Sequence, residues 1–293
     1  MKYVSILIIV LFTASCSNTK KAIEAQPAPV REVATVTDVQ DLVEIPSVLD
    51  TPNSDKTNVP EPPKPPKLEE AKITDHYYPE KFNHNRWNTL LSKNVTKNGN
   101  VDYKAFKNNP LELQVYIDNL THRLPTEDWD KNDKLAYWIN AYNALTIDLI
   151  IRNYPTKSIK DIKDPWDQRL WKFGSKWQNL NDIEHKILRN MNEPRIHFAI
   201  VCASVSCPKL QNEAFTALNI EAQLVKATNE FLNDTSKNKL SEDRIQLSKL
   251  FKWFKKDFEN SGSLIDFLNL YTDIKISSKA KKSFMDYNWN LND

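Results

Sequence analysis

The chain has 293 residues, of which only three are glycine and three are cysteine. Glycine is about 1% of the chain, against a usual share of about 7%. The three glycines lie far apart, so the sequence has neither the GxGxxG pattern of dinucleotide binding nor the GxxxxGK[ST] phosphate loop. The 40 basic residues nearly balance the 38 acidic ones. No net positive field is therefore available to hold nucleic acid, and we expect no nucleic-acid partner.

Residues 1–15 have the order that is typical of a secretory signal peptide. Lys2 provides the positive start, residues 4–12 form an apolar segment, and small residues lead up to Cys16. The apolar segment is too short to cross a bilayer as a helix of the mature protein. The sequence therefore predicts export from the cytoplasm.

Small residues followed by a cysteine resemble the lipobox of bacterial lipoproteins. The resemblance implies that Cys16 is lipidated, with acyl chains such as palmitate, and that these chains anchor the protein to a bacterial membrane. Ser17 stands where an inner-membrane lipoprotein would carry aspartate, which favours the outer membrane and places the rest of the chain in the bacterial cell envelope or periplasm. The alternative is ordinary signal cleavage, with Cys16 incidental.

Residues 16–73 have the composition of a disordered tether. Nine of the sixteen prolines, and no aromatic residue, lie between residues 17 and 70. Such a segment buries too little apolar surface to offset the entropy of ordering, and its proline runs favour an extended spacer. We expect it to connect the lipidated N-terminus to a folded domain.

Residues 74–293 carry all eight tryptophans and both remaining cysteines, and they predict one globular domain. Its fold class is α+β, dominated by helices, with a small sheet and no βαβ repeat. Residues 195–201 and 244–247 are the predicted strands, 101–103 is an extended piece, and 160–180 is an aromatic loop. The predicted helices span residues 77–91, 110–120, 132–154, 182–191, 214–233, 250–259 and 263–271.

Polar side chains stand out in two apolar stretches. Asn140 and Asn143 are three residues apart, so their amides project from one face of the same helix. The structural interpretation, in which they hold a neighbouring loop, is favoured over a role with substrate, because a buried amide needs hydrogen-bond partners. Glu184 and His185 are neighbours in a helix and do not face each other, so they do not form an acid–base pair.

The segment 202–207 follows the predicted strand that contains His197, and it places Ser204 and Ser206 between two cysteines. Three interpretations are open. The cysteines form a disulfide, as an exported protein favours. They bind zinc with His185 and His197, although the spacing is unusual for zinc and we expect no metal. Or one of them is a nucleophilic thiolate that works with a histidine and an amide.

Five separated motifs in this order look like the domain-of-unknown-function 547 family: WINAYNALT, IEHKILR, RIHFAIVCASVSCPKL, IQLSKLFKWFKKDF and YNWNLN. The resemblance extends over residues 77 to 290. Its implications are modest, since the activity of the family is not established, although similar proteins include bacterial envelope lipoproteins. A distant likeness to papain-type and transglutaminase-type enzymes is analogy alone. The family pattern falls on Asn140, Asn143, Glu184, His185, Arg189, His197, Cys202, Ser206 and Cys207.

For an enzyme, this resemblance suggests a Cys–His acyl-transfer reaction such as amide hydrolysis or amine exchange. Cys207 would be the nucleophile at the start of a helix, with Pro208 as its first residue. His185 or His197 would be the general base, and Asn140 the orienting or oxyanion-binding amide. Supporting roles would belong to Cys202, Asn143, Glu184, Arg189 and Ser206, and no cofactor is expected.

The second hypothesis is a non-catalytic envelope module. A disulfide between Cys202 and Cys207 would stiffen it, and the aromatic loop from Trp166 to Trp177 would bind a peptide, a glycan or a partner protein. The two hypotheses differ in the expected number of free thiols.

Overall fold

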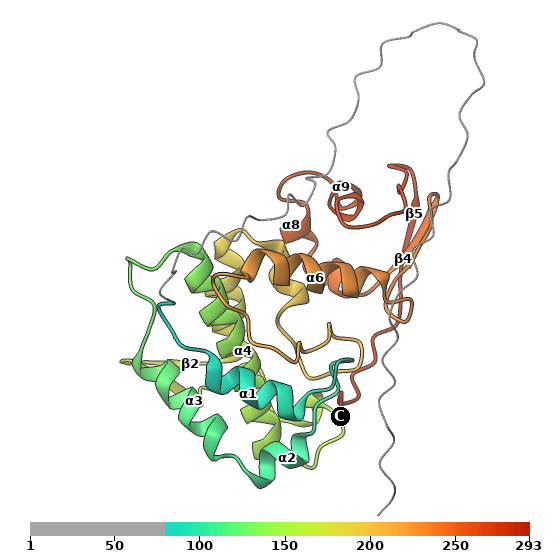
Figure 1. Cartoon of the computed structure of the whole chain (residues 1–293). Coiled ribbons are helices and arrows are strands. Elements are labelled where there is room, and N and C mark those ends of the chain that lie inside the picture. The colour runs from blue at the N-terminus through green and yellow to red at the C-terminus, as the bar shows by residue number, and fades with distance from the viewer. Residues whose placement is uncertain (1–79) are drawn as a thin grey trace, which may run out of the picture. The chain divides into compact units, whose positions relative to one another are not determined.

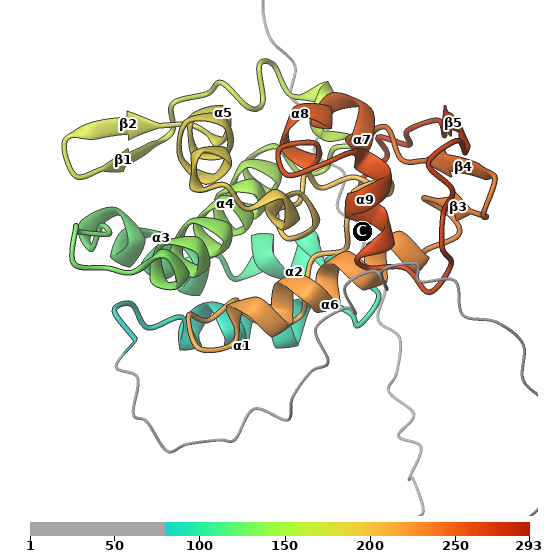
Figure 2. The same cartoon turned by 90° about the horizontal axis from the view of Figure 1, so that it is seen from above.

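The computed structural model describes residues 80–293. The predicted signal peptide, Cys16 and the predicted tether lie outside the described residues. Within them, helices dominate and the strands form two small sheets, one of two strands and one of three. The predicted α+β class is confirmed. Figures 1 and 2 show the two sheets at opposite ends of the domain, with α4 between them.

The long helix α4 (Lys131–Asn153) is the centre of the fold. Asp130 caps it by accepting a hydrogen bond from the backbone N–H of Asp133. It is buried on nearly every side and contacts α2 (Tyr103–Asn108) and α3 (Leu111–His122), while α1 (Asn85–Asn94) packs on α2 and α3. A helix that is surrounded in this way has apolar residues on all faces, as the predicted helix 132–154 has.

The predicted helix 182–191 exists, but its middle is not α-helical. It begins as α5 (Leu180–Asp182), capped by Asn179, and continues as the π-helical turn η2 (Ile183–Leu188) and the 3₁₀ turn η3 (Arg189–Met191). Asn192, in the left-handed conformation, ends it. π-Helical turns are rare and occur frequently at functional sites.

The predicted strand 195–201 is wrong. Its first part is the 3₁₀ helix η4 (Pro194–Phe198), with Pro194 in the first position and the carboxylate of Glu193 as the cap. Backbone N–H groups bond three residues back, as from Ala199 to Ile196. The run of apolar residues reflects burial on all sides, and a buried helix has the same pattern as a buried strand.

The predicted aromatic loop 160–180 contains a hairpin. Strand β1 (Trp171–Phe173) pairs with β2 (Lys176–Gln178) in antiparallel register, and the 3₁₀ turn η1 (Ile159–Asp161) precedes them. Gly174 has φ +56 in the turn between the strands. The side chains of Trp171 and Phe173 are buried, so these two rings belong to the core.

The C-terminal part forms a second lobe around a three-stranded sheet. Strand β4 (Arg244–Leu247), which was predicted, pairs antiparallel with β3 (Lys239–Leu240) and parallel with β5 (Lys281–Phe284). Helices α7 (Leu250–Trp253), α8 (Lys255–Phe258) and α9 (Leu264–Asn269) lie between β4 and β5 in the chain. Ser263 and Asp266 form the capping box of α9.

Helix α6 (Ile220–Asn233) is shorter than the predicted helix 214–233. Side-chain amides bind the backbone of the preceding residues and keep it out of the helix. The side chain of Asn88 accepts from the N–H of Ala214 at 2.9 Å, and Asn140 binds both polar groups of Phe215. This competition with helical hydrogen bonds is not visible in the local sequence.

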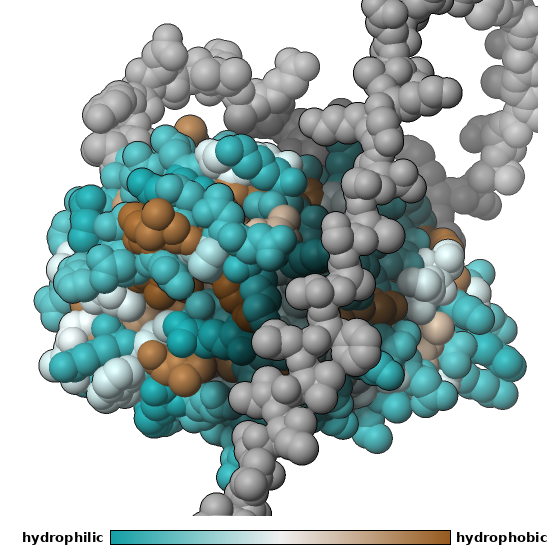
Figure 3. All heavy atoms as spheres, turned by 90° about the horizontal axis from the view of Figure 1, so that it is seen from below, coloured by the Kyte–Doolittle hydropathy of each residue, from teal (hydrophilic) through white to brown (hydrophobic). Residues whose placement is uncertain are grey.

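Two apolar clusters make up the core. The larger surrounds α4, and the smaller joins α6 to the second lobe through Phe198, Phe231 and Phe251. On the face shown in Figure 3, apolar side chains gather in separate patches within a hydrophilic surface. Among the described helices, none is long and apolar enough to cross a membrane.

Candidate functional site

A cavity of about 320 Å³ lies where the two apolar clusters meet, and we call it the site cavity. Ile200 from the larger cluster and Leu250 from the smaller one both line it. The cavity also brings together five of the residues predicted from the sequence: Glu184, His185, His197, Cys202 and Cys207.

The two helix asparagines hold the backbone beside this cavity. The fully buried Asn143 donates to the carbonyl of Ala199 at 2.9 Å and accepts from the N–H of Val201 at 3.0 Å. Asn140 binds Phe215 in the same two-sided way, at 2.7 and 3.0 Å. Both ends of the Asn140 amide are therefore bound to Phe215, and Asn140 does not line the cavity. This geometry supports the structural interpretation and gives Asn140 no orienting or oxyanion-binding role.

Residues 202–207, which we call the thiol loop, have a strained backbone. Ala203 has φ +56, a conformation that costs an L-residue other than glycine about 1–2 kcal/mol. The C-terminal segment 287–292 supports the loop: Val205 donates to the carbonyl of Asn290 at 2.8 Å, and Ser206 Oγ accepts from the N–H of Asn288 at 2.8 Å. Such strain persists where the surroundings determine the backbone, and it is frequent at functional sites.

Both cysteines of the thiol loop are free. The backbone N–H of Cys202 donates to Cys207 Sγ at 2.8 Å. Burial acts to raise the pKa of Cys207, but hydrogen bonds from the Cys202 thiol and backbone, from Tyr287 and from Ser204 outweigh it and lower the pKa to about 7. Cys207 is therefore the thiol that is ready to ionise.

The pKa of Cys202 is shifted in the opposite direction from that of Cys207. Its hydrogen bond to Cys207, together with burial, raises its pKa well above the ordinary value. Its Sγ lies 3.2 Å from Ser204 Oγ and 3.3 Å from Tyr287 Oη.

The prediction that a helix starts at Cys207 is wrong. In the described chain, the next helix after the thiol loop is α6, which begins at Ile220. A helix dipole therefore does not lower the pKa of Cys207, and direct hydrogen bonds do so instead.

A charged network borders the other side of the cavity. Asp257 of α8 accepts from Arg189 Nε at 2.6 Å and Nη2 at 2.8 Å, and from His197 Nε2 at 2.8 Å. Arg189 Nη1 lies 2.7 Å from His185 Nδ1. The ring of Phe254 stacks on His197 with 3.9 Å between centroids. Neither histidine forms a hydrogen bond with a thiol in the described structure.

Arg189 and Asp257 determine which ring nitrogen carries the proton when His185 and His197 are neutral. A guanidinium only donates, so His185 Nδ1 accepts and its proton is on Nε2. A carboxylate only accepts, so His197 carries its proton on Nε2 and keeps a lone pair on Nδ1. Among the described residues, Asn229 Oδ1 alone is a fully buried side-chain nitrogen or oxygen without a partner. His197 Nδ1 has no hydrogen-bond partner in the described structure, and the His197 side chain is almost completely buried.

Burial is the main cause of a lowered pKa in both histidines. For His197 it outweighs the opposing attraction of Asp257, and for His185 the charge of Arg189 adds to it. The pKa of Asp257 is itself held below its ordinary value: burial opposes this shift, but the bonds from His197 and Arg189 outweigh it. His197 is thus a neutral base oriented by a carboxylate.

Glu184 is a buried carboxyl group in the π-helical turn. Burial raises its pKa to about 7, although the hydrogen bond from Tyr142, at 3.0 Å, and the charge of Arg189 act to lower it. Its Oε2 accepts the hydrogen bond from Tyr142, and Oε1 has no hydrogen-bond partner in the described structure. At neutral pH this group is close to half protonated.

Three groups of this site were missed by reasoning from the sequence. Asp257 lies 60 residues from His197 in the chain, and Tyr287 and Trp289 come from the C-terminal segment. The signal was present, since IQLSKLFKWFKKDF and YNWNLN contain these residues. Of the predicted aromatic loop, Trp166 lines the cavity, whereas Trp171 is buried in the core and Trp177 is exposed elsewhere.

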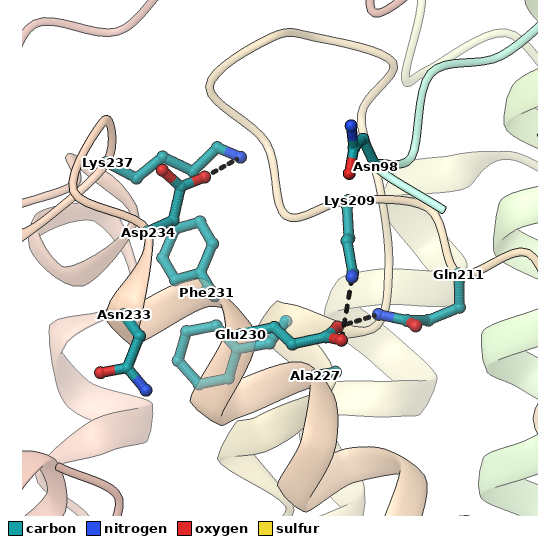
Figure 4. Close-up of a pocket in the computed structure, with 10 residues that line it drawn as sticks. Asn98, Lys209, Gln211, Ala227, Glu230, Phe231, Asn233, Asp234 and Lys237 are labelled. Carbon is teal, nitrogen blue, oxygen red and sulfur yellow. Dashed lines mark hydrogen bonds and ion pairs between the residues drawn. The ribbon is translucent and has the colours of Figure 1, made fainter. Parts of the chain in front are cut away.

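A second cavity, of about 360 Å³, is shown in Figure 4. Lys209 and Gln211 both bind the carboxylate of Glu230 there, at 2.9 and 3.0 Å, and Lys237 pairs with Asp234 at 2.9 Å. Its charges are satisfied by one another, and no thiol or histidine lines it. The chemistry therefore favours the site cavity. Within residues 80–293, no group of three or more histidine, cysteine or acidic side chains is arranged to hold a metal ion.

Comparison with known proteins gives one match. Residues 126–232 match the family model described as protein of unknown function, DUF547. The match includes α4, the π-helical turn and the thiol loop, and it ends before Asp257 and Tyr287. No curated protein and no solved structure matches the chain. Residues 126–232, about a third of the chain, are therefore similar to the DUF547 family.

Proposed function

We propose that this domain is a cysteine-dependent acyl-transfer enzyme, an amide hydrolase or a transglutaminase-like enzyme, with Cys207 as its nucleophile. The observation that carries the proposal is the 2.8 Å hydrogen bond from the Cys202 N–H to Cys207 Sγ inside a cavity lined by an acid and two histidines. A backbone N–H that donates to sulfur stabilises the thiolate, the reactive form.

In the first half of the reaction, the Cys207 thiolate attacks the carbonyl carbon of an amide. The new S–C bond forms, the C–N bond breaks, and the leaving nitrogen takes a proton from the Glu184 carboxyl group. The pKa of Glu184, about 7, suits an acid at neutral pH. The Nε2–H of His185 is the available donor for the developing oxyanion.

In the second half, water hydrolyses the thioester. His197 Nδ1 removes a proton from the water while its oxygen attacks the acyl carbon, and the S–C bond breaks to restore the thiolate. Asp257 holds the imidazole in the required tautomer. An amine in place of water would give amine exchange. The proton on His197 returns to Glu184 through solvent.

A second candidate follows from the contact between the two thiols. The side chains of Cys202 and Cys207 are hydrogen-bonded to each other, which favours a disulfide once an oxidant is present. A bridged pair would make the domain a non-catalytic binding module of the envelope.

We also propose that lipidation at Cys16 anchors the chain to the bacterial outer membrane and that the domain works in the cell envelope. The support is the order of the N-terminal residues, a charged start, an apolar segment and small residues before cysteine. Metabolic labelling with a palmitate analogue, in the full chain and in Cys16→Ser, tests this; label that remains in Cys16→Ser would contradict it.

The enzyme proposal is tested with p-nitrophenyl acetate as an acyl donor and mass spectrometry of the trapped protein. We expect acetyl transfer to Cys207, none in Cys207→Ser, and retained transfer in the matched Cys202→Ser variant. The thiols are counted in protein purified without reductant. An intact bridge between the two cysteines, or acetylation that is the same in Cys207→Ser, would overturn the proposal and favour the binding module.

A further inference from the structure

Four aromatic side chains form one continuous side of the site cavity: Trp166, Trp253, Tyr287 and Trp289. We call them the aromatic wall. Trp289 is at its centre, 4.5 Å from Tyr287, 5.7 Å from Trp253 and 5.9 Å from Trp166 between ring centroids. These residues come from three parts of the chain that are far apart in sequence, and they meet at the cavity.

The wall lies at the edge of the hydrophobic core, because Trp166 and Trp289 are only partly buried and pack against the larger cluster. Trp253 is 46% exposed, and the ring N–H groups of Trp166, Trp253 and Trp289 form no hydrogen bond in the described structure. A core indole of the same domain behaves differently, since Trp171 donates to Asp148 at 2.7 Å. Buried indoles usually satisfy their N–H group in this way. The wall therefore offers apolar ring faces together with unused donors.

The charges beside the wall disfavour a cationic occupant. The ammonium of Lys160 already lies 5.2 Å from the centroid of Trp289, and the guanidinium of Arg189 lies 5.4 Å from that of Phe254. A further cation on these rings would meet like charge, which opposes the attraction of an aromatic face. The face of Trp289 beside Lys160 therefore suits a neutral group better than a second cation, even though the carboxylates of Asp167 and Glu184 line the same cavity.

Polar groups complement the wall. Asp167 and Asn181 line the same cavity, and the Asn181 amide donates to the Asp167 carboxylate at 3.1 Å. Each keeps further hydrogen-bonding capacity for a ligand. A flat ring with C–H groups on one face and hydroxyl groups at its edge uses the indole faces, the indole N–H groups and these two side chains together. A sugar ring has this chemistry.

We propose that the aromatic wall binds a sugar ring and thereby presents an amide of the same carbohydrate to Cys207. The inference rests on the proposed function and names its substrate class: an amide-bearing sugar such as an N-acylated amino sugar. The cavity of about 320 Å³ is at the small end of ligand pockets, about 300–1,000 Å³, and suits a single ring with its substituent.

The test is titration with the trisaccharide of N-acetylglucosamine, followed by calorimetry and by tryptophan fluorescence. We expect saturable binding to the full chain and to Cys207→Ser. We expect affinity about tenfold lower or worse in Trp253→Ala, because a stacked ring face is lost. Trp177→Ala is the matched control: Trp177 is 52% exposed and does not line this cavity, so its loss should leave the affinity unchanged.

The glucose trisaccharide, which lacks the amide, should bind more weakly. Absence of saturable binding to the full chain, an equal loss in Trp253→Ala and Trp177→Ala, or tighter binding of phenylalanine amide than of the sugar would overturn the inference. Acetylation of Cys207 by p-nitrophenyl acetate is measured in the same proteins. If acetylation persists without sugar binding, the substrate class is wrong and the proposed function stands; if acetylation fails while sugar binds, the proposed function falls.

Discussion

At His185 and His197, the charged neighbour of each imidazole determines which ring nitrogen keeps its proton. Arg189 occupies one nitrogen of His185 as a donor, and Asp257 occupies one nitrogen of His197 as an acceptor. The sequence places both histidines near apolar residues and does not distinguish between them. The difference appears only when Asp257, which is distant in the chain, is brought beside His197.

The hydroxyl of Tyr287 contributes to the lowered pKa of Cys207. In Tyr287→Phe we expect the pKa of Cys207 to rise by roughly one unit, since one hydrogen bond to the thiolate is lost. The rate of alkylation by iodoacetamide, measured from pH 5 to pH 9, should have its midpoint near 7 in the parent and higher in the variant. Tyr154→Phe is the control, because the hydroxyl of Tyr154 has no hydrogen-bond partner in the described structure. A midpoint that is unchanged in Tyr287→Phe would contradict the assignment.

Glu184 should make the protein less stable as the pH rises. Its pKa is about 7 in the fold and near 4.3 in an unfolded chain. Between these values the folded state binds more protons than the unfolded state, so stability falls with pH over this window and is constant above it. The free energy of unfolding from urea titrations should decline by up to about 4 kcal/mol from this group, and Glu184→Gln should remove that decline. If parent and variant have parallel profiles from pH 4.5 to 7, Glu184 ionises normally.

At the scale of elements, the helices with strong apolar spacing were predictable and the segments around the site were not. The pattern from Leu135 to Ile150 predicts α4, and Ser263 predicts the start of α9. The run 195–201 is equally consistent with a strand, and only packing on both sides makes it the 3₁₀ helix η4. The segment before α6 is irregular because its backbone binds the side-chain amides of Asn88 in α1 and Asn140 in α4. These two residues are distant in the sequence, so the local pattern does not reveal the contacts. The chemistry of the side chains was therefore enough to identify the candidate residues from the sequence. It was not enough to predict which residues they contact.

The turn at Gly99 packs closely against Lys209 and Leu210, which follow the thiol loop. Gly99 has φ +85, and a Cβ there would lie 2.4 Å from Lys209 Cβ and 2.9 Å from its Cα. Gly99→Ala should therefore cost at least about 2 kcal/mol in the free energy of unfolding, from the left-handed backbone and the clash together. It should also slow alkylation of Cys207, two residues before Lys209. The control is Gly262→Ala, which also has a positive φ, +156, but whose nearest atom, Asp266 Oδ2, is 3.2 Å away, so it carries the backbone cost without the close contact. Equal losses in the two variants would contradict the close contact.

At the scale of the whole molecule, the C-terminal segment 287–292 joins parts of the chain that are otherwise separate. It supports the thiol loop through Asn288 and Asn290, supplies two rings of the aromatic wall, and reaches the turn at Gly99 through Asn292. Leu291 also donates its N–H to the carbonyl of Lys157 at 2.8 Å. The shape of the site cavity therefore depends on residues from both ends of the domain.

The side chain of Asn292 binds the C-terminal segment 287–292 to the first part of the domain. Its buried side chain accepts from the hydroxyl of Tyr103 at 2.7 Å and donates to the carbonyl of Gly99 at 3.3 Å. Asn292→Ala leaves both groups without this partner, so we expect a loss of about 1–3 kcal/mol in the free energy of unfolding by urea. We also expect faster hydrogen exchange at Val205 and Ser206, whose N–H groups bond to the same segment.

Asn288→Ala provides the matched control, since the exposed Asn288 side chain only accepts from the N–H of Asn290 within the segment. Its stability should change by less than about 0.5 kcal/mol. Exchange at Val205 and Ser206 separates a local effect from a global one. If Asn292→Ala destabilises the protein while the two amides keep their protection relative to the rest of the domain, the segment does not support the thiol loop. Selective loss of protection there links the last residues of the chain to the position of Cys207.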